Sequence, residues 1–204
     1  MSAGSPTVGR EEPSEDAIDT RALENLRTLE RQTGKEGIAR ACAAQLPESS
    51  SIFLNIGTTT EEVAKALCGH KRLRIITNNL NVANILAETQ DCEVVVTGGN
   101  LRRTDGGLVG KLATDTILQF KFDLAIIGCS ALDPDGDLLD FDIQEVGVSQ
   151  AILLQSRKTY LVADASKLKR NAPARIASLS EIDTVFTDAP LPADLPEKCA
   201  AWDT

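Results

Sequence analysis

Residues able to bind an anion or a sugar hydroxyl occur in several short polar segments of this sequence. In the first segment a glycine precedes three hydroxyl side chains: Gly57, Thr58, Thr59 and Thr60. Glycine lets a backbone approach an anion closely, and a helix that begins there offers free N–H groups and the positive end of its dipole. The segment is therefore typical of a phosphate-binding loop, although one of the threonines could simply cap the helix.

Two further segments contain amide and guanidinium groups. They are Asn78 with Asn79, and Gly98, Gly99 and Asn100 followed by Arg102 and Arg103. An Asn side chain both donates and accepts hydrogen bonds and can read hydroxyl groups, but it also suits a turn that begins a helix. The glycine pair could be an ordinary turn. One of the arginines could present its planar fork to an anion, and a solvated arginine is the alternative.

Two carboxylates, Asp142 and Glu145, stand three residues apart where a helix is expected to begin. This spacing puts them on one face, where they could accept hydrogen bonds from hydroxyl groups or act as base and acid. The same spacing matches a capping box, with Asp142 as the N-cap and Glu145 as the third helical residue. The two interpretations can coexist, because a capping carboxylate keeps one oxygen free.

Lys167 follows Asp164 and Ser166 just past an apolar run, where a lysine can neutralise a phosphate as a compact point charge. The loop is basic in any case, so a solvated cation is the alternative. The candidate ligand-binding residues are therefore Gly57, Thr58, Thr59, Thr60, Asn78, Asn79, Gly98, Gly99, Asn100, Arg102, Asp142, Glu145 and Lys167. No catalytic triad can be assembled around the only histidine, His70.

The elements that must position these residues are β-rich runs alternating with stretches of helical length. The runs begin at Ser51, Leu73, Cys92, Phe122, Thr159 and Thr184, and residues 61–67, 81–88 and 143–156 have helical period. Such alternation predicts βαβ units in a three-layer α/β domain with a largely parallel sheet. Ligands of open α/β sheets collect beyond the carboxyl ends of the strands, so we expect the polar loops to meet in one crevice.

The composition predicts an acidic flexible linker over residues 1–32 and a folded domain over residues 33–204. The linker is poor in large apolar residues and cannot bury enough surface to order itself. Three leucines at helical spacing predict a short helix near its end: Leu23, Leu26 and Leu29. Thr33 followed by Glu36 matches a capping box, so we expect a helix of the domain to begin at Thr33.

The charge balance argues against nucleic-acid binding by this chain alone. The 204 residues carry a formal net charge of −9 and a sequence pI of about 4.7, whereas a nucleic-acid binder typically has a pI above roughly 9. No apolar run approaches the roughly 20 residues of a membrane helix, and the amino terminus does not resemble a signal peptide. We therefore expect a cytoplasmic protein that makes no membrane contact.

The sequence also predicts that the chain holds no cofactor and no metal. Its five cysteines are far apart and form no C-x-x-C pair, which argues against a zinc site or a disulfide framework. Residues 105–112 (DGGLVGKL) have three residues between the glycines instead of the four of a P-loop, and leucine follows the lysine. The glycine pattern of dinucleotide-binding domains is absent as well.

Several motifs, taken in order, resemble the effector-binding domain of DeoR-type transcriptional repressors. They are NIGTTTEEVAKAL from Asn55, RIITNNLNVANIL from Arg74, VVTGGNLRRTDGGLVG from Val95, DLLDFDIQEVGVSQAIL from Asp137 and LVADASKLKRNA from Leu161. The resemblance runs from about residue 34 to residue 192. It implies a sugar-phosphate isomerase-like and CoA-transferase-like fold that serves as a sensor. The implied effector is a phosphorylated sugar or polyol, with glycerol 3-phosphate as the first candidate, held across the loops named above.

The resemblance further implies that a winged helix-turn-helix module binds operator DNA and that the effector weakens this binding. Residues 1–32 show no recognition-helix pattern, so we expect DNA contact only through a module not present in this chain. Because repressors that read two half-sites are normally symmetric, we also expect a homodimer or a homotetramer.

A sugar-phosphate isomerase-like enzyme is the alternative function, since the same fold also occurs in ribose-phosphate isomerases. Glu145 would then be the base and Lys167 the anion anchor. The isomerase pattern places a catalytic lysine in a glycine-rich turn before the helix with this glutamate, whereas residues 138–142 contain none. Without such an electrophile the enediolate lacks stabilisation, so we expect no enzymatic activity.

Overall fold

The structure, a computed structural model, describes residues 15–192 and 194–204, with side chains from residue 28 onward. The boundary between two compact units lies between Thr33 and Gly34, and helix α1 (Glu15–Ala43) runs through it without a break. None of the helices in these described ranges is both long enough and apolar enough to span a bilayer.

The expectation that a helix begins at Thr33 is wrong, because α1 begins at Glu15. The Thr33 hydroxyl donates to the Leu29 carbonyl at 3.0 Å, a bond typical of a threonine inside a helix. The residues around Thr33 include good helix formers such as Arg, Leu, Glu and Gln, and these continue the helix through the capping-box pattern. Residues 15–32, predicted as linker, are thus helical, and residues 1–14 lie outside the described part.

Six strands form one fully parallel sheet in the order β11-β9-β6-β1-β2-β3. The strands are β1 (Ser51–Leu54), β2 (Leu73–Thr77), β3 (Cys92–Val96), β6 (Leu124–Ile127), β9 (Thr159–Val162) and β11 (Thr184–Phe186). Each of the six predicted runs contributes one of these strands. The predicted α/β class with a parallel-rich sheet is confirmed.

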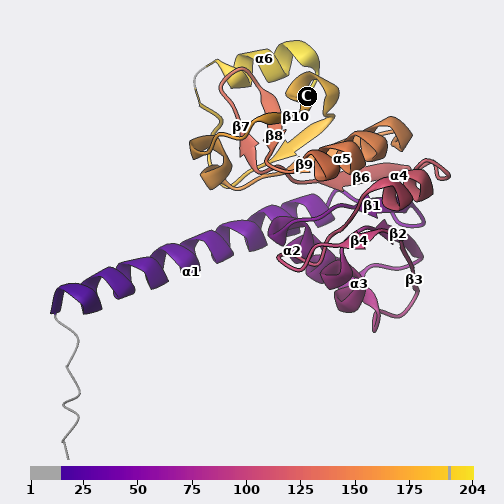
Figure 1. Cartoon of the computed structure of the whole chain (residues 1–204), viewed down its shortest axis with the longest axis horizontal. Coiled ribbons are helices and arrows are strands. Elements are labelled where there is room, and N and C mark those ends of the chain that lie inside the picture. The colour runs from indigo at the N-terminus through magenta and orange to yellow at the C-terminus, as the bar shows by residue number, and fades with distance from the viewer. Residues whose placement is uncertain (1–14, 193) are drawn as a thin grey trace, which may run out of the picture. The chain divides into compact units, whose positions relative to one another are not determined.

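Helices cover both faces of this sheet (Figure 1). One face is covered by the C-terminal part of α1 with α2 (Thr58–Ala66) and α3 (Leu80–Leu86), and the other by α4 (Lys111–Ile117) and α5 (Ile143–Gln155). Helix α6 (Leu195–Trp202) packs against the 3-10 turn η3 (Leu179–Glu181), and the other 3-10 turns are η1 (Leu67–Gly69) and η2 (Ala165–Lys169). Successive strand residues face opposite layers. Ile52 and Leu54 therefore pack with α1, α2 and α3, whereas Phe53 packs with α4 and α5.

Two small antiparallel sheets carry the loops that matter for the candidate site. One has the order β10-β8-β7 and consists of β7 (Ala131–Leu132), β8 (Asp137–Asp140) and β10 (Ala174–Ser178). The other is the hairpin of β4 (Asn100–Leu101) and β5 (Leu108–Val109). Strand β8 leads directly into α5, and the hairpin loop carries Arg102.

The strand order reverses at β1, since β2 and β3 extend the sheet to one side and β6, β9 and β11 to the other. Such a reversal opens a crevice beyond the carboxyl ends of the central strands. Gly128, directly after β6, shows how close these ends are. A Cβ built there would lie 3.7 Å from the Ile56 carbonyl oxygen and 3.9 Å from that of Val162.

Substitution of a core phenylalanine tests this packing. Phe53 is fully buried in β1 and meets Phe122 edge to face with ring centroids 5.1 Å apart. We expect Phe53→Ala to lower the free energy of unfolding by about 3–5 kcal/mol, measured by urea denaturation. Phe141, which is 62% exposed, supplies the matched control, and Phe141→Ala should cost no more than about 0.5 kcal/mol. Equal losses in the two variants would contradict the assigned core.

Candidate functional site

Helix α2 begins directly beyond β1, and no side chain within the described residues caps it. Its N-cap is Gly57, with a φ of 146° that favours glycine. The Thr60 hydroxyl faces the carbonyl oxygens of Asn55 and Gly57, at 2.8 and 2.6 Å, instead of a helical N–H. Thr59 and Thr60 are buried, and Thr58 is exposed. The alternative that a threonine caps the helix is therefore wrong, and the N–H groups of the first turn are available to an anion.

One lysine contacts this helix terminus, and a second lysine interacts electrostatically with the first. The Lys35 Nζ atom on α1 donates to Thr58 Oγ1 at 2.7 Å. Lys167 lies half-buried in η2, just beyond β9. Its ammonium has no ion-pair or hydrogen-bond partner among the residues that the structure describes. Burial lowers the pKa of Lys167, and the neighbouring Asp164 partly opposes that shift.

Asp164 has the structural role of ordering the loop that carries Lys167. It is buried, and its carboxylate accepts a hydrogen bond from Ser166 N at 2.9 Å at the start of η2. Burial alone would raise the pKa of Asp164, but the hydrogen bonds from Ser166 and the charges of Lys167 and Lys35 lower it. Uncapped α2, Lys35 and Lys167 together form what we call the cationic part of the site.

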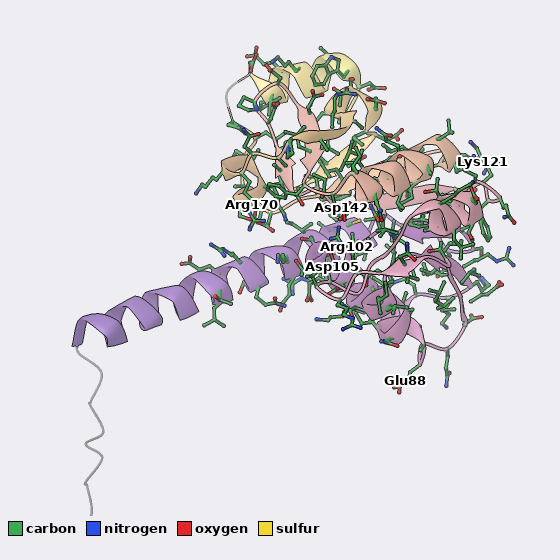
Figure 2. The ribbon with its side chains drawn as sticks, viewed as in Figure 1. Glu88, Arg102, Asp105, Lys121, Asp142 and Arg170 are labelled. Carbon is green, nitrogen blue, oxygen red and sulfur yellow. The ribbon has the colours of Figure 1, made fainter. Side chains whose placement is uncertain are left out.

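The acidic part of the site consists of Arg102 and the carboxylates that surround it. The guanidinium pairs with Asp105, with Asp142 at 2.9 Å and with Glu145 at 2.6 Å. Arg102, Asp105 and Asp142 gather in the middle of the body, whereas Glu88 and Lys121 lie at its edges (Figure 2). Burial works against the charged guanidinium, but the three carboxylates outweigh it and raise the pKa of Arg102. Arg102, which was predicted to bind a ligand anion, thus already forms ion pairs with three carboxylates of the chain.

The predicted capping box at α5 forms only in part. Asp142 is the N-cap and accepts from Gln144 N at 2.8 Å. Glu145 does not complete the box, because its buried carboxylate pairs with Arg102. Burial, followed by the charge of Asp140, raises the pKa of Glu145 to about 7, although Arg102 acts against this shift.

The two asparagines beyond β2 have different roles. Asn79 caps α3, accepting from Asn81 N at 2.9 Å, and its amide donates to Glu61 at 3.2 Å. Asn78 is fully buried, and its amide donates to the Leu108 carbonyl at 3.2 Å. Its Oδ1 atom has no hydrogen-bond partner in the described part of the chain. Of the pair, Asn78 is therefore the residue with hydrogen-bonding capacity left, because buried polar atoms are normally paired.

The Gly98–Gly99–Asn100 segment lies at the base of the hairpin that carries Arg102. A Cβ at Gly98 would lie 2.8 Å from a methyl carbon of Leu112, and a Cβ at Gly99 2.8 Å from the Val109 carbonyl oxygen. Asn100 pairs with Val109 in the hairpin and is exposed. The two glycines thus serve close packing against β5 and α4.

Cys129, buried beyond β6, links the two parts of the site electrostatically. Burial raises the pKa of its thiol to about 12, with Lys167 acting against this shift and Asp140 and Asp164 adding to it. Cys129 is thus influenced by Lys167 of the cationic part and by Asp140, which also raises the pKa of Glu145 in the acidic part.

Sequence reasoning missed three contributing residues: Lys35, Asp105 and Asp140. Asp105 stands three residues after Arg102, a spacing that could have revealed the ion pair. Asp140 lies buried, and its Oδ1 atom accepts from Phe141 N and Asp142 N at 2.7 and 3.1 Å. Lys35 gave no local signal, because its partner Thr58 is 23 residues away.

The body is an α/β domain whose polar loops follow the strands at the reversal of the strand order. The family model of the DeoR C-terminal sensor domain matches residues 30–189, and the chain belongs to this family. The family is non-enzymatic, which sets aside the isomerase alternative.

Two repressors show how similar this chain is to known proteins. The glycerol-3-phosphate regulon repressor of Escherichia coli K12 is 49% identical over 79% of this chain and 64% of its own length. The repressor of the same name from Haemophilus influenzae is 47% identical over 80% of this chain and 62% of its own length. The chain therefore spans less than two thirds of these transcriptional repressors.

Among solved structures, the eIF2B delta subunit of Chaetomium thermophilum aligns with a TM-score of 0.59 and 14% identity. The alignment covers 89% of this chain and 66% of that subunit. At this level of identity the likeness concerns the fold alone, and it agrees with the α/β architecture described above.

The pKa of Glu145 predicts a pH dependence of stability. Folding raises this pKa from 4.5 to about 7, so the folded chain binds more protons than the unfolded chain between these values. The stability contributed by Glu145 therefore falls as pH rises through this window. Between about pH 5 and about pH 8, we expect wild type to lose about 1–3 kcal/mol of unfolding free energy that Glu145→Gln does not lose.

Urea denaturation across this pH range measures the difference. Glu48→Gln is the matched control, because the Glu48 side chain is 60% exposed and the variant should keep the wild-type pH profile. Parallel profiles for wild type and Glu145→Gln would show that the pKa of Glu145 is not raised.

Proposed function

We propose that this chain is the effector-sensing domain of a DeoR-family repressor and that it binds a phosphorylated polyol or sugar, with glycerol 3-phosphate as the first candidate. The observation that carries the proposal is the half-buried Lys167 ammonium, which makes no hydrogen bond or ion pair in the described part of the chain, together with the α2 terminus that no side chain there caps. A half-buried cation that makes no ion pair is costly, and a phosphate would pair with it directly.

The phosphate is proposed to bind between Lys167 and the first turn of α2, where Gly57 permits close approach of the backbone. Thr58 is the exposed threonine of this turn and would add a hydroxyl contact. Lysine and helical N–H groups both suit a phosphate dianion. This arrangement assigns the sequence-derived candidates at residues 57–60 and 167 to the charged end of the effector.

The hydroxyl end of the effector is proposed to meet the acidic part of the site. Asp142 and Glu145 are acceptors for hydroxyl groups, and Arg102 holds both in position. Asn78 Oδ1, which has no hydrogen-bond partner among the described residues, is a further acceptor for a hydroxyl group. Carboxylates here would repel a second phosphate, so the arrangement favours a ligand with phosphate at one end and hydroxyls at the other.

We further propose that this domain regulates DNA binding within a full-length repressor of the same kind as its relatives. The similar repressors carry the name of the glycerol-3-phosphate regulon, and their length leaves room for a further module. We place operator binding in a winged helix-turn-helix module outside this chain, and the complete repressor in the cytoplasm as a homodimer or homotetramer. A coupling of about 1–3 kcal/mol would change operator affinity by about 5- to 150-fold.

Thermal-shift titration tests the effector. Glycerol 3-phosphate, glycerol and a panel of sugar phosphates are titrated into the chain, and a ligand that binds the folded state raises the unfolding midpoint. We expect compounds with one phosphate ester to raise the unfolding midpoint, and sugar bisphosphates to raise it less. Absence of a shift with every phosphorylated compound would refute the proposal.

Replacement of Lys167 tests the phosphate contact. We expect Lys167→Met to weaken binding of glycerol 3-phosphate by about tenfold or more, because a hydrogen bond to a charged group is lost. Isothermal titration calorimetry measures the dissociation constants. Lys169→Met is the matched control on the same turn, since Lys169 is exposed, and it should leave the affinity unchanged. Comparable losses in the two variants would remove the role of Lys167.

A further inference from the structure

Lys35 is the feature that the proposed phosphate site leaves unexplained. It belongs to the C-terminal part of α1, and its ammonium donates to the Thr58 hydroxyl at 2.7 Å. Thr58 is the first residue of α2, at the uncapped terminus. A lysine side chain is thus aimed at the helix end that has no cap of its own.

A second contact joins the same part of α1 to the loop with Lys167. A Cβ at Gly34 would lie 2.3 Å from Asp188 Oδ2, so the helix backbone and this carboxylate are in close contact. The other oxygen of Asp188 accepts from Ala165 N at 2.7 Å, at the start of η2. Two adjacent residues of α1 therefore touch both walls of the cationic part, one through Thr58 and one through Asp188.

Lys35 makes no ion pair among the residues that the structure describes. Its ammonium is close enough to Lys167 and Asp164 to influence the ionisation of both. Two carboxylates lie nearby: Asp164, which accepts from Ser166 N, and Asp188, which accepts from Ala165 N. Neither forms an ion pair with Lys35 or Lys167 within the described residues, so a bound dianion would give both ammonium groups a direct partner.

We propose that Lys35 is a third phosphate-binding group of this site, and that it exchanges the Thr58 hydroxyl for a phosphate oxygen when a phosphorylated effector binds. The proposal rests on the proposed function and adds to it a residue that no strand-end loop contains. An ammonium has three donors on a flexible stem, so it can turn from a hydroxyl to a phosphate without displacement of the backbone.

This exchange of partners would couple ligand binding to a contact made by α1. The proposed contacts at residues 57–60 and 167 lie in loops beyond β1 and β9, whereas Lys35 places one contact on α1. Occupation of the site thereby replaces an internal contact of α1 with a contact to the ligand. A ligand that binds differently to two states shifts the balance between them.

Calorimetric titration with glycerol 3-phosphate and with inorganic phosphate tests this role. We expect Lys35→Met to weaken both ligands by about tenfold or more, and Lys35→Arg, which keeps the charge, to remain within about threefold of wild type. Lys65→Met is the matched control. It removes the same charge from the last turn of α2, where the side chain is 55% exposed, and it should change the affinity by less than about twofold.

Distinct results separate this inference from the proposed function. If neither probe binds wild type, both proposals fall. If wild type binds and Lys35→Met matches Lys65→Met, Lys35 makes no phosphate contact and only the present inference falls. A loss in Lys35→Arg as large as that in Lys35→Met would also overturn it, because side-chain shape and not charge would then matter. Unfolding midpoints measured without ligand confirm that each variant is folded.

Discussion

The convergence of β1, β6 and β9 at the reversal of the strand order is the constraint on which the rest of this structure depends. Parallel strands deliver their carboxyl ends to one edge of the sheet, and the close approach at Gly128 keeps the three ends together. Three parts of the site follow from that edge, since α2 comes after β1, Cys129 after β6 and Lys167 after β9. The apolar layers on both faces fix these starting points, because alternate strand residues pack into opposite cores.

The candidate site has a cationic part and an acidic part. Lys35 contacts the uncapped terminus of α2, whereas the Arg102 guanidinium is enclosed by carboxylates. Burial disfavours the charged form of the ionisable group in both, as the lowered pKa of Lys167 and the raised pKa of Glu145 reflect. A ligand that relieved these costs would gain binding energy by doing so.

Much of the fold was predictable because its signals are local. The six β-rich runs and the helical stretches between them read correctly from hydrophobic period alone, and Asp142 and Asn79 cap the helices that their positions suggested. The prediction that a helix begins at Thr33 was wrong, because a capping pattern inside a run of helix formers does not interrupt the helix. The alternative that a threonine caps α2 was also wrong. The Thr60 hydroxyl donates to carbonyl oxygens, and the Thr58 hydroxyl accepts a hydrogen bond from Lys35.

The sequence by itself determined the α/β class, the family and the polar strand ends, because periodicity and motif order are properties of neighbouring residues. Tertiary structure alone decided which charges meet. Arg102 lies 40 residues from Asp142, and Lys35 lies 23 residues from Thr58. Only the folding of the sheet brings such pairs within hydrogen-bond distance, and no spacing along the chain records it. For the same reason the burial that shifts the pKa of Glu145 and of Lys167 became visible only once both layers were packed around the sheet.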